Sequence, residues 1–175
     1  LGETRFSSSH TTPESVDLLR MMADFRERGA NALILEVSSH ALEQHRADGV
    51  CFDVAIFTNL TPEHLDYHGD LKGYFASKRR LFSELLGSGC AIFNRDDDFG
   101  RLLSDEFPEG LSFGNENADI CVKQISLGRD GIKGIFSTPT GEVGINSSLI
   151  GAFNVSNLLA TVAAVSSLGI SPDLI

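Results

Sequence analysis

The chain has 175 residues, of which 42% are hydrophobic, and 14 basic against 24 acidic residues give it a formal net charge of −10. This length and apolar content are typical of one globular domain with its own core, and the acidic balance argues against nucleic acid as a partner. Three cysteines without a CxxC pair, and no run of 18 apolar residues, exclude a disulfide framework, a cysteine metal knuckle and a membrane span. The cysteine usage fits the reducing cytoplasm, which is the localisation we expect.

A helix is predicted near the start of the chain. Thr12 can cap it, Pro13 suits its first position, and apolar residues follow helical spacing until Gly29. The run 32–38 then has the length and apolar content of a buried strand. Glu36 in this run is unusual, because a buried carboxylate costs several kcal/mol unless it is paired or binds a metal. The alternative for Glu36 is a strand end in contact with solvent.

The following segments alternate in the same way. Apolar runs at 54–57 and 91–93 predict two further strands, and helical spacing over 71–86 predicts a helix between them. Near-continuous apolar strands separated by helices are typical of a mostly parallel sheet that is flanked by helices.

The second half has a different pattern. Short β-rich runs separated by glycine-containing turns predict an antiparallel meander appended to the α/β body, with strands at 120–127, 132–137 and 142–149. A helix rich in Ala, Leu and Val follows over 154–168 and ends at Gly169. The predicted fold class is therefore α/β, a mostly parallel sheet flanked by helices with an appended antiparallel β meander.

Polar residues concentrate at the predicted ends of the first two strands, where ligands bind in parallel sheets. His64 and His68 have the spacing of zinc ligands on a helix, but Pro62 and Gly69 leave little room for one, and no cysteine is near. A hard cation held by Glu36 and a histidine, opposite phosphate groups, is favoured over a zinc hydrolase site.

Several motifs resemble the central domain of the Mur ligase family, which has a P-loop NTPase-like fold. These motifs are EVSSHALEQHR (36–46), TNLTPEHLDYHGD (58–70), YFASKRRLF (74–82), NRDD (94–97) and GAFNVSNLLA (151–160). They extend over nearly the whole chain in the order of the family. The segment EVSSHALEQHR further resembles the family member that adds the third amino acid of the peptidoglycan stem peptide.

The resemblance implies an ATP-dependent amide-bond ligase that adds diaminopimelate or lysine to UDP-MurNAc-L-Ala-D-Glu through an acyl phosphate. The implied partners are this precursor, ATP and the amino acid. Two alternatives stay open: a related ligase, such as folylpolyglutamate synthase or another stem-peptide ligase, and a non-catalytic nucleotide-binding module. The residues after EVSSH argue against the related ligases. Retention of Glu36, His64 and Lys78 together argues against a non-catalytic module.

The resemblance also implies a magnesium site. Glu36 corresponds to a ligand of the Mg²⁺ on the ATP phosphates, and His64 to a ligand of a second Mg²⁺. Lys78 corresponds to a catalytic lysine that is carbamylated, and a carbamate supplies the anionic oxygen that Mg²⁺ prefers. The alternative for Lys78 is an ordinary solvated lysine beside Arg79 and Arg80.

The implied contacts to substrate and nucleotide follow in the same way. The residues that correspond to precursor-binding positions are Thr11, Thr12, Ser38, Gln44 and Arg46, and those near the adenine of ATP are Asn154 and Asn157. An arginine can grip a carboxylate or phosphate with two hydrogen bonds. Helix capping is the alternative for Thr11, Thr12 and Asn154. His10 departs from the family pattern, which usually has Asn there.

No GxxxxGK[ST] phosphate loop occurs in residues 1–175, although the family has this loop in the same domain. We therefore expect the chain to be a fragment of the central ATP-binding domain. The phosphate loop, the amino-terminal uridine-binding domain and the carboxy-terminal amino-acid domain are expected elsewhere in a longer protein. The fragment by itself is expected to be inactive.

Overall fold

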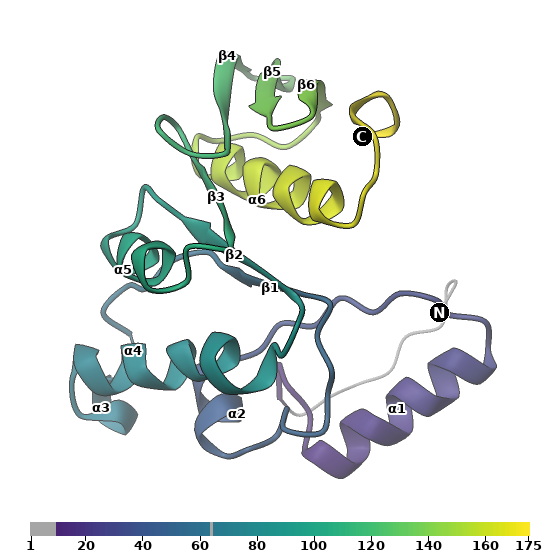
Figure 1. Ribbon diagram of the computed structural model, residues 1–175, viewed down its shortest axis with the longest axis vertical. Helices are drawn as coiled ribbons and strands as arrows, with labels where there is room; N and C mark the ends of the chain where they lie inside the picture. The colour runs from purple at the N-terminus through teal and green to yellow at the C-terminus, as the bar shows by residue number, and fades with distance from the viewer. Residues whose placement is uncertain (1–9, 64) are drawn as a thin grey trace. The chain divides into compact units, whose positions relative to one another are not determined.

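The computed structural model describes residues 10–63 and 65–175, which divide into two units. Residues 10–52 and 65–87 form the first unit, and residues 53–63 and 88–175 form the second. Figure 1 labels the helices and strands of both units. Among the described residues, no helix has both the length and the hydropathy needed to cross a bilayer.

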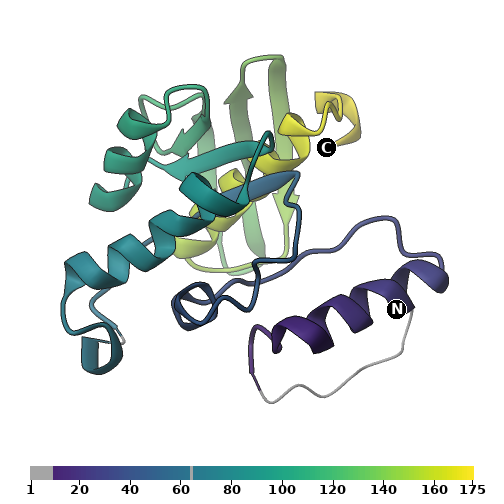
Figure 2. The ribbon, with the colours of Figure 1, turned by 60° about the horizontal axis from the view of Figure 1, so that its bottom comes forward.

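The second unit is built on a six-stranded sheet with the order β1-β2-β3-β4-β5-β6. Its strands are β1 (Val54–Phe57), β2 (Cys90–Asn94), β3 (Leu111–Gly114), β4 (Ile120–Gly128), β5 (Gly131–Thr138) and β6 (Gly141–Ser147). The pairs from β1 to β4 are parallel, and β4, β5 and β6 pair antiparallel, side by side in Figure 2. The predicted meander is therefore confirmed, and it continues the parallel sheet through β4.

The turn between β4 and β5 depends on a glycine. The two strands pair as far as Gly128 and Gly131. Gly131 has a φ of +131°, and a Cβ at this position would lie 2.0 Å from the carbonyl oxygen of Ser147 on the neighbouring strand. Only glycine fits both this backbone conformation and this close approach.

Helix α6 (Phe153–Ser167) provides the main core of the second unit. It packs against all strands from β1 to β5 (Figure 1). The fully buried residues of this core include Ile92, Phe113, Phe136, Val143 and Leu159. Burial of such aliphatic and aromatic side chains is the main stabilising contribution to a domain of this kind.

The opposite face of the sheet is covered by α5 (Asp98–Glu106). Side chains alternate across a strand, so Phe93 points away from the core to which Ile92 belongs, and its ring lies 6.1 Å from that of Phe107 at the end of α5. A Cβ on Gly100 would lie 1.9 Å from the Asn94 carbonyl oxygen, so this glycine allows α5 to approach β2 closely.

The first unit is helical in its described part. It contains α1 (Ser15–Glu27), α2 (Ser39–Glu43), α3 (Leu65–His68), α4 (Leu71–Arg80) and a π-helical turn (Leu81–Leu85) that continues α4. Helices α2 and α3 both pack against α4. The side chain of Asp70 begins α4 by accepting a hydrogen bond of 2.8 Å from the backbone N–H of Gly73.

The predicted strand at 32–38 is wrong. The segment is extended, but it pairs with no strand among the described residues, and Ile34 is 98% exposed. A strand needs a hydrogen-bonded neighbour, and an apolar run by itself cannot supply one. Glu36 is accordingly exposed at the side chain and is not the buried strand-end carboxylate that the pattern suggests.

The remaining predicted elements are confirmed, with boundaries within two residues. The strand at 54–57, the helix over 71–86 and the helix over 154–168 correspond to β1, α4 with its π-helical turn, and α6. Helix α5 and strand β3 have no counterpart in the prediction. The three cysteines are free thiols, as expected.

Candidate functional site

Thr12 connects the chain before α1 to the segment before α2. Its buried hydroxyl donates to the carbonyl oxygen of Glu36 at 2.8 Å and accepts from the backbone N–H of Ser38 at 3.1 Å. The predicted cap is wrong: Glu14 is the N-cap residue of α1, and no side chain caps it. Among residues 10–63 and 65–175 the segment 36–38 has no strand partner, and the Thr12 hydroxyl satisfies two of its backbone groups.

Arg46 extends this connection toward α3. Its guanidinium is only 10% exposed; Nη1 donates to the Thr12 carbonyl at 3.2 Å, and Nη2 donates to Gln44 Oε1. Nε forms an ion pair with Glu14 at 3.2 Å without hydrogen-bond geometry. Gln44 Nε2 in turn donates to the hydroxyl of Tyr67 at 3.0 Å. One network therefore joins the start of α1, the end of α2 and α3.

This network includes most of the predicted precursor-binding residues. Thr12, Gln44 and Arg46 are linked directly, and Ser38 joins through its backbone N–H. The Ser38 side chain also caps α2 by accepting from the N–H of Ala41 at 3.2 Å. Thr11 is exposed next to Thr12.

The predicted metal ligands are described only in part. The Glu36 carboxylate is exposed and has no partner among residues 10–63 and 65–175. Lys78 is half-buried on α4, with Nζ 5.2 Å from the centroid of the Tyr74 ring. His64 lies outside the described residues. Within the described ranges, no three His, Cys, Asp or Glu side chains are grouped to hold a metal by themselves.

The structure shows a cluster of aromatic and histidine rings between α2, α3 and α4 that the sequence analysis did not predict. The His40 and Tyr67 rings are 4.2 Å apart, and the His68 ring stacks on Tyr74 at 5.1 Å. His68 Nε2 lies 2.9 Å from Ser39 Oγ, so its ring is engaged within the unit. All four ring residues lie in the quoted motifs, but their spacing in the sequence does not predict that the rings are in contact.

A hydrogen bond between Ser77 on α4 and Glu43 on α2 supports the packing of these two helices. Ser77 Oγ donates to Glu43 Oε2 at 2.6 Å, and Ser77 is buried. Ser77 immediately precedes Lys78 on α4, so this bond fixes the backbone that carries the lysine.

Arg80 fixes the end of α4 to the turn after α2. It donates to the Leu42 carbonyl and to Asp48 Oδ2 at 2.8 Å, and Asp48 also contacts His45 Nδ1 at 2.7 Å. The Arg80 hydrogen bond, reinforced by His45, lowers the pKa of Asp48 below its ordinary 3.8 although partial burial opposes the shift. The same contact raises the pKa of Arg80.

The predicted adenine-side residues lie on the first two turns of α6, in the second unit. Asn154 Nδ2 donates to the Ile150 carbonyl at 2.8 Å, and Asn157 Nδ2 donates to Asn154 Oδ1 at 3.0 Å. These two bonds orient both amides and leave Asn157 Oδ1 without a donor among the described residues. Phe153 beside them is 71% exposed.

The NRDD motif shapes the end of β2. Asn94 Nδ2 donates to the Thr58 carbonyl at 2.7 Å, and Asp97 Oδ2 accepts from the Leu60 N–H at 3.2 Å. Asp97 Oδ1 caps α5 by accepting from the N–H groups of Phe99 and Gly100. The motif thus holds the loop after β1 in place.

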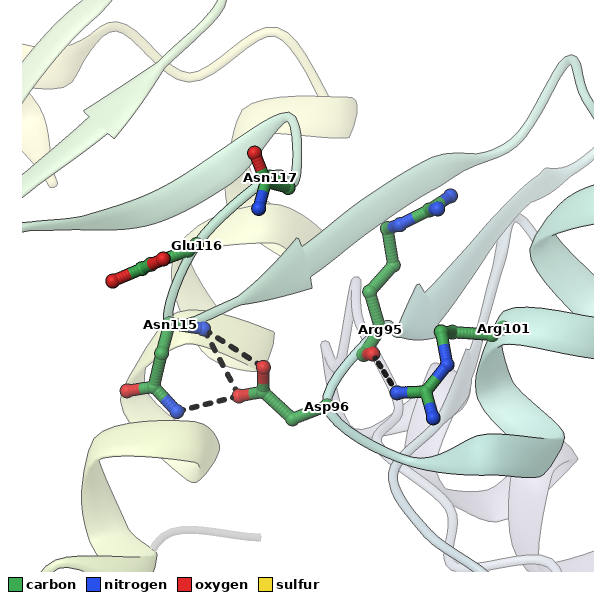
Figure 3. A pocket seen from close by; sticks show the side chains of 6 residues that line it. All are labelled: Arg95, Asp96, Arg101, Asn115, Glu116 and Asn117. Atoms are coloured by element: carbon green, nitrogen blue, oxygen red, sulfur yellow. Dashed lines mark hydrogen bonds between the residues drawn. The ribbon is translucent and has the colours of Figure 1, made fainter.

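An open pocket of about 590 Å³ lies in the second unit beyond the ends of β2 and β3 (Figure 3). Its polar groups bond mainly to one another: Asp96 accepts from the N–H and the side-chain amide of Asn115, and Arg101 donates to the Arg95 carbonyl. None of the predicted site residues lines it. Two basic and two acidic side chains line the pocket, so its net charge does not favour an anionic ligand.

Comparison with known proteins gives consistent results. Residues 1–165 match the model of the Mur ligase middle domain. The UDP-N-acetylmuramoyl-L-alanyl-D-glutamate–2,6-diaminopimelate ligases of Geobacter metallireducens and Geobacter sulfurreducens are 47% and 45% identical to the chain, each over 99% of the chain and 36% of the relative. A solved structure with the same enzyme name superposes with a TM-score of 0.84 at 30% identity, covering 97% of this chain and 38% of that one. The chain spans about a third of the length of these relatives.

Replacement of Thr12 tests the first connection. We expect Thr12→Val to keep the shape of the side chain and to leave the Glu36 carbonyl and the Ser38 N–H unpaired. The free energy of unfolding should fall by about 1–3 kcal/mol, measured by urea denaturation, with faster hydrogen exchange at Ser38. Thr12→Ser, which keeps the hydroxyl, is the matched control and should protect that amide. Equal protection in Thr12→Val would contradict the connection.

The Arg80–Asp48 contact predicts a pH dependence. Because the folded-state pKa of Asp48 lies below the unfolded value near 3.8, its stabilising effect is complete above that pH and is lost as the pH falls through the lower folded-state pKa. The stability difference between wild type and Asp48→Asn should therefore be constant near neutral pH and shrink below pH 3.8. Thermal unfolding across pH 3 to 7 measures it. A difference that grows on acidification would refute the assignment.

Proposed function

The chain belongs to the Mur ligase family as part of its middle domain, and from that premise we propose that it is part of an ATP-dependent ligase that extends UDP-MurNAc-L-Ala-D-Glu by one amino acid. The relatives are named for 2,6-diaminopimelate, so we propose this amino acid rather than lysine. The same names favour this activity over a folylpolyglutamate synthase or a non-catalytic module. The activity belongs to the complete ligase, in which the phosphate loop and the uridine-binding and amino-acid domains are supplied outside residues 1–175.

The observation that carries the proposal is the hydrogen-bonded network of Thr12, Ser38, Gln44 and Arg46. Thr12 lies at least 26 positions before the other three residues in the sequence, and all four correspond to precursor-binding positions of the family. Hydroxyl, amide and guanidinium groups suit the sugar, peptide and phosphate groups of a nucleotide-linked precursor. Thr11 extends the same polar surface.

The amides of α6 suit the adenine of ATP. The hydrogen bonds of Asn154 leave the Asn157 side-chain oxygen as an acceptor. An acceptor at this position pairs with the 6-amino group of adenine and not with the 6-oxo group of guanine. The amide orientation therefore supports the proposed role of Asn154 and Asn157 in nucleotide binding.

The donor chemistry of the first unit fits magnesium. The exposed carboxylate of Glu36, which has no partner among the described residues, is available as an oxygen ligand. A carbamate on Lys78 would supply a second anionic oxygen, and His64 is the further proposed ligand. Bound magnesium would offset the negative charge that accumulates on the phosphates during phosphoryl transfer.

In the proposed reaction, a carboxylate oxygen of the precursor attacks the terminal phosphorus of ATP, and ADP leaves. The amine of diaminopimelate then attacks the acyl carbon, forming the amide bond and releasing phosphate and a proton. The role of this chain is to hold the precursor and the nucleotide in position, because phosphoryl transfer depends mainly on alignment and charge stabilisation.

The direct test is a ligation assay with the complete ligase. We expect ATP-dependent formation of the tripeptide precursor from UDP-MurNAc-L-Ala-D-Glu and diaminopimelate, detected by mass spectrometry together with phosphate release. Parallel reactions with lysine, with D-alanyl-D-alanine and with a folate and glutamate separate the related ligases. Failure to form a tripeptide precursor with any of the amino acids would refute the proposal.

Lys78 has its own test. We expect Lys78→Ala to abolish ligation, and a short-chain carboxylic acid to restore part of it by supplying the missing oxygen ligand. Carbon-13 bicarbonate should give a carbamate signal in the wild-type protein that Lys78→Ala lacks. Lys72→Ala, which removes an exposed lysine from the same helix, is the matched control and should keep activity and signal. Full activity of Lys78→Ala without additive would exclude the role.

A further inference from the structure

The Tyr67 hydroxyl lies at the outer end of the Thr12–Arg46–Gln44 network. It accepts a hydrogen bond from Gln44 Nε2 at 3.0 Å. A tyrosine hydroxyl has one proton to donate, and among residues 10–63 and 65–175 that proton has no acceptor. The side chain is 44% exposed, so a ligand can reach it.

Gln44 has a fixed orientation beside this hydroxyl. Arg46 can only donate, so the Gln44 atom that faces it must be the oxygen, and the amide nitrogen must face Tyr67. One N–H of Gln44 is used by Tyr67, and the second has no acceptor in the described part of the chain. The Gln44 amide nitrogen and the Tyr67 hydroxyl oxygen, which are 3.0 Å apart, therefore each carry one hydrogen without an acceptor among the described residues.

The ring of Tyr67 is held from two sides. Its centroid lies 4.2 Å from that of His40 on α2 and 4.9 Å, edge to face, from that of His68 on α3. Such ring contacts restrict the side chain before a ligand binds, so the hydroxyl is ordered at little further entropic cost.

Arg46 contributes to this arrangement from inside. Its guanidinium is only 10% exposed, and its contacts are to Thr12, Glu14 and Gln44. Within the network, Arg46 sets the orientation of the Gln44 amide, while Gln44 and Tyr67 present donors outward.

We propose that Tyr67 is a further precursor-binding residue, whose hydroxyl donates to a carbonyl or carboxylate oxygen of the bound precursor, next to the Gln44 amide. This inference rests on the proposed function. An oxygen acceptor is required because both unused groups are donors. The oxygen can belong to the dipeptide or to the sugar N-acetyl group, since both offer carbonyl oxygens.

The test compares Tyr67→Phe with wild type in the complete ligase. The variant keeps the ring contacts and removes the hydroxyl, so the melting temperature should be unchanged. The KM for UDP-MurNAc-L-Ala-D-Glu should rise about three- to tenfold, the effect of one lost hydrogen bond, with kcat and the KM for ATP little changed. Ser83→Ala is the matched control, because in the described part of the chain the exposed Ser83 hydroxyl bonds only the Arg79 carbonyl of its own helix, and its precursor KM should be unchanged.

Two further measurements complete the test. Binding of UDP-MurNAc, which lacks the peptide, should be weakened by Tyr67→Phe only if the oxygen belongs to the sugar. In a double-mutant cycle, Gln44→Ala and Tyr67→Phe should be non-additive, because the two side chains are hydrogen-bonded to each other.

An unchanged precursor KM in Tyr67→Phe, or full additivity in the cycle, would overturn this inference while the wild-type ligase remains active on the precursor. A wild-type ligase that neither binds nor extends the precursor would instead refute the proposed function itself.

Discussion

Backbone groups that regular structure leaves unpaired must be satisfied by side chains, and this constraint shapes both units of the protein. In the described part of the first unit, the segment 36–38 lacks a strand neighbour, and the buried hydroxyl of Thr12 bonds the Glu36 carbonyl and the Ser38 N–H. In the second unit, Asn94 and Asp97 do the same for the loop after β1 and for the start of α5. Asn94 and Asp97 belong to the NRDD motif, and Thr12 is one of the predicted precursor-binding residues.

Polar side chains in these motifs both satisfy backbone groups and present polar groups to a ligand. This explains why the motifs combine small polar residues with a few charged ones. Ser38 caps α2 by accepting a hydrogen bond, and its hydroxyl proton has no acceptor among residues 10–63 and 65–175. Arg46 is nearly buried, so its charge is offset by Glu14 and its donors hold Thr12 and Gln44. A change at either position would therefore alter both the stability of the unit and the surface that it presents to a ligand.

The two units differ in what stabilises them. The second has a conventional apolar core, in which α6 packs against the strands β1 to β5. The first depends more on polar contacts between short helices, with Arg80 joining α4 to the turn after α2 and with Ser77 bonded to Glu43. Polar contacts of this kind are geometrically specific, which suits a unit whose role is to position functional groups.

The sequence by itself determined the elements that have strong local patterns. The run 54–57, the helix over 71–86 and the hairpins after Ile120 are present as predicted, because apolar periodicity and glycine turns are local properties of the chain. The motifs also identified the family and most residues of the candidate site. The apolar run 32–38 was misleading, since strand formation depends on a neighbour and not on composition. Only the tertiary structure decided that Thr12 bonds 36–38 rather than capping α1, and that Gln44 meets Tyr67. Such contacts join residues that are more than 20 positions apart, and their geometry is fixed by packing that no local pattern encodes.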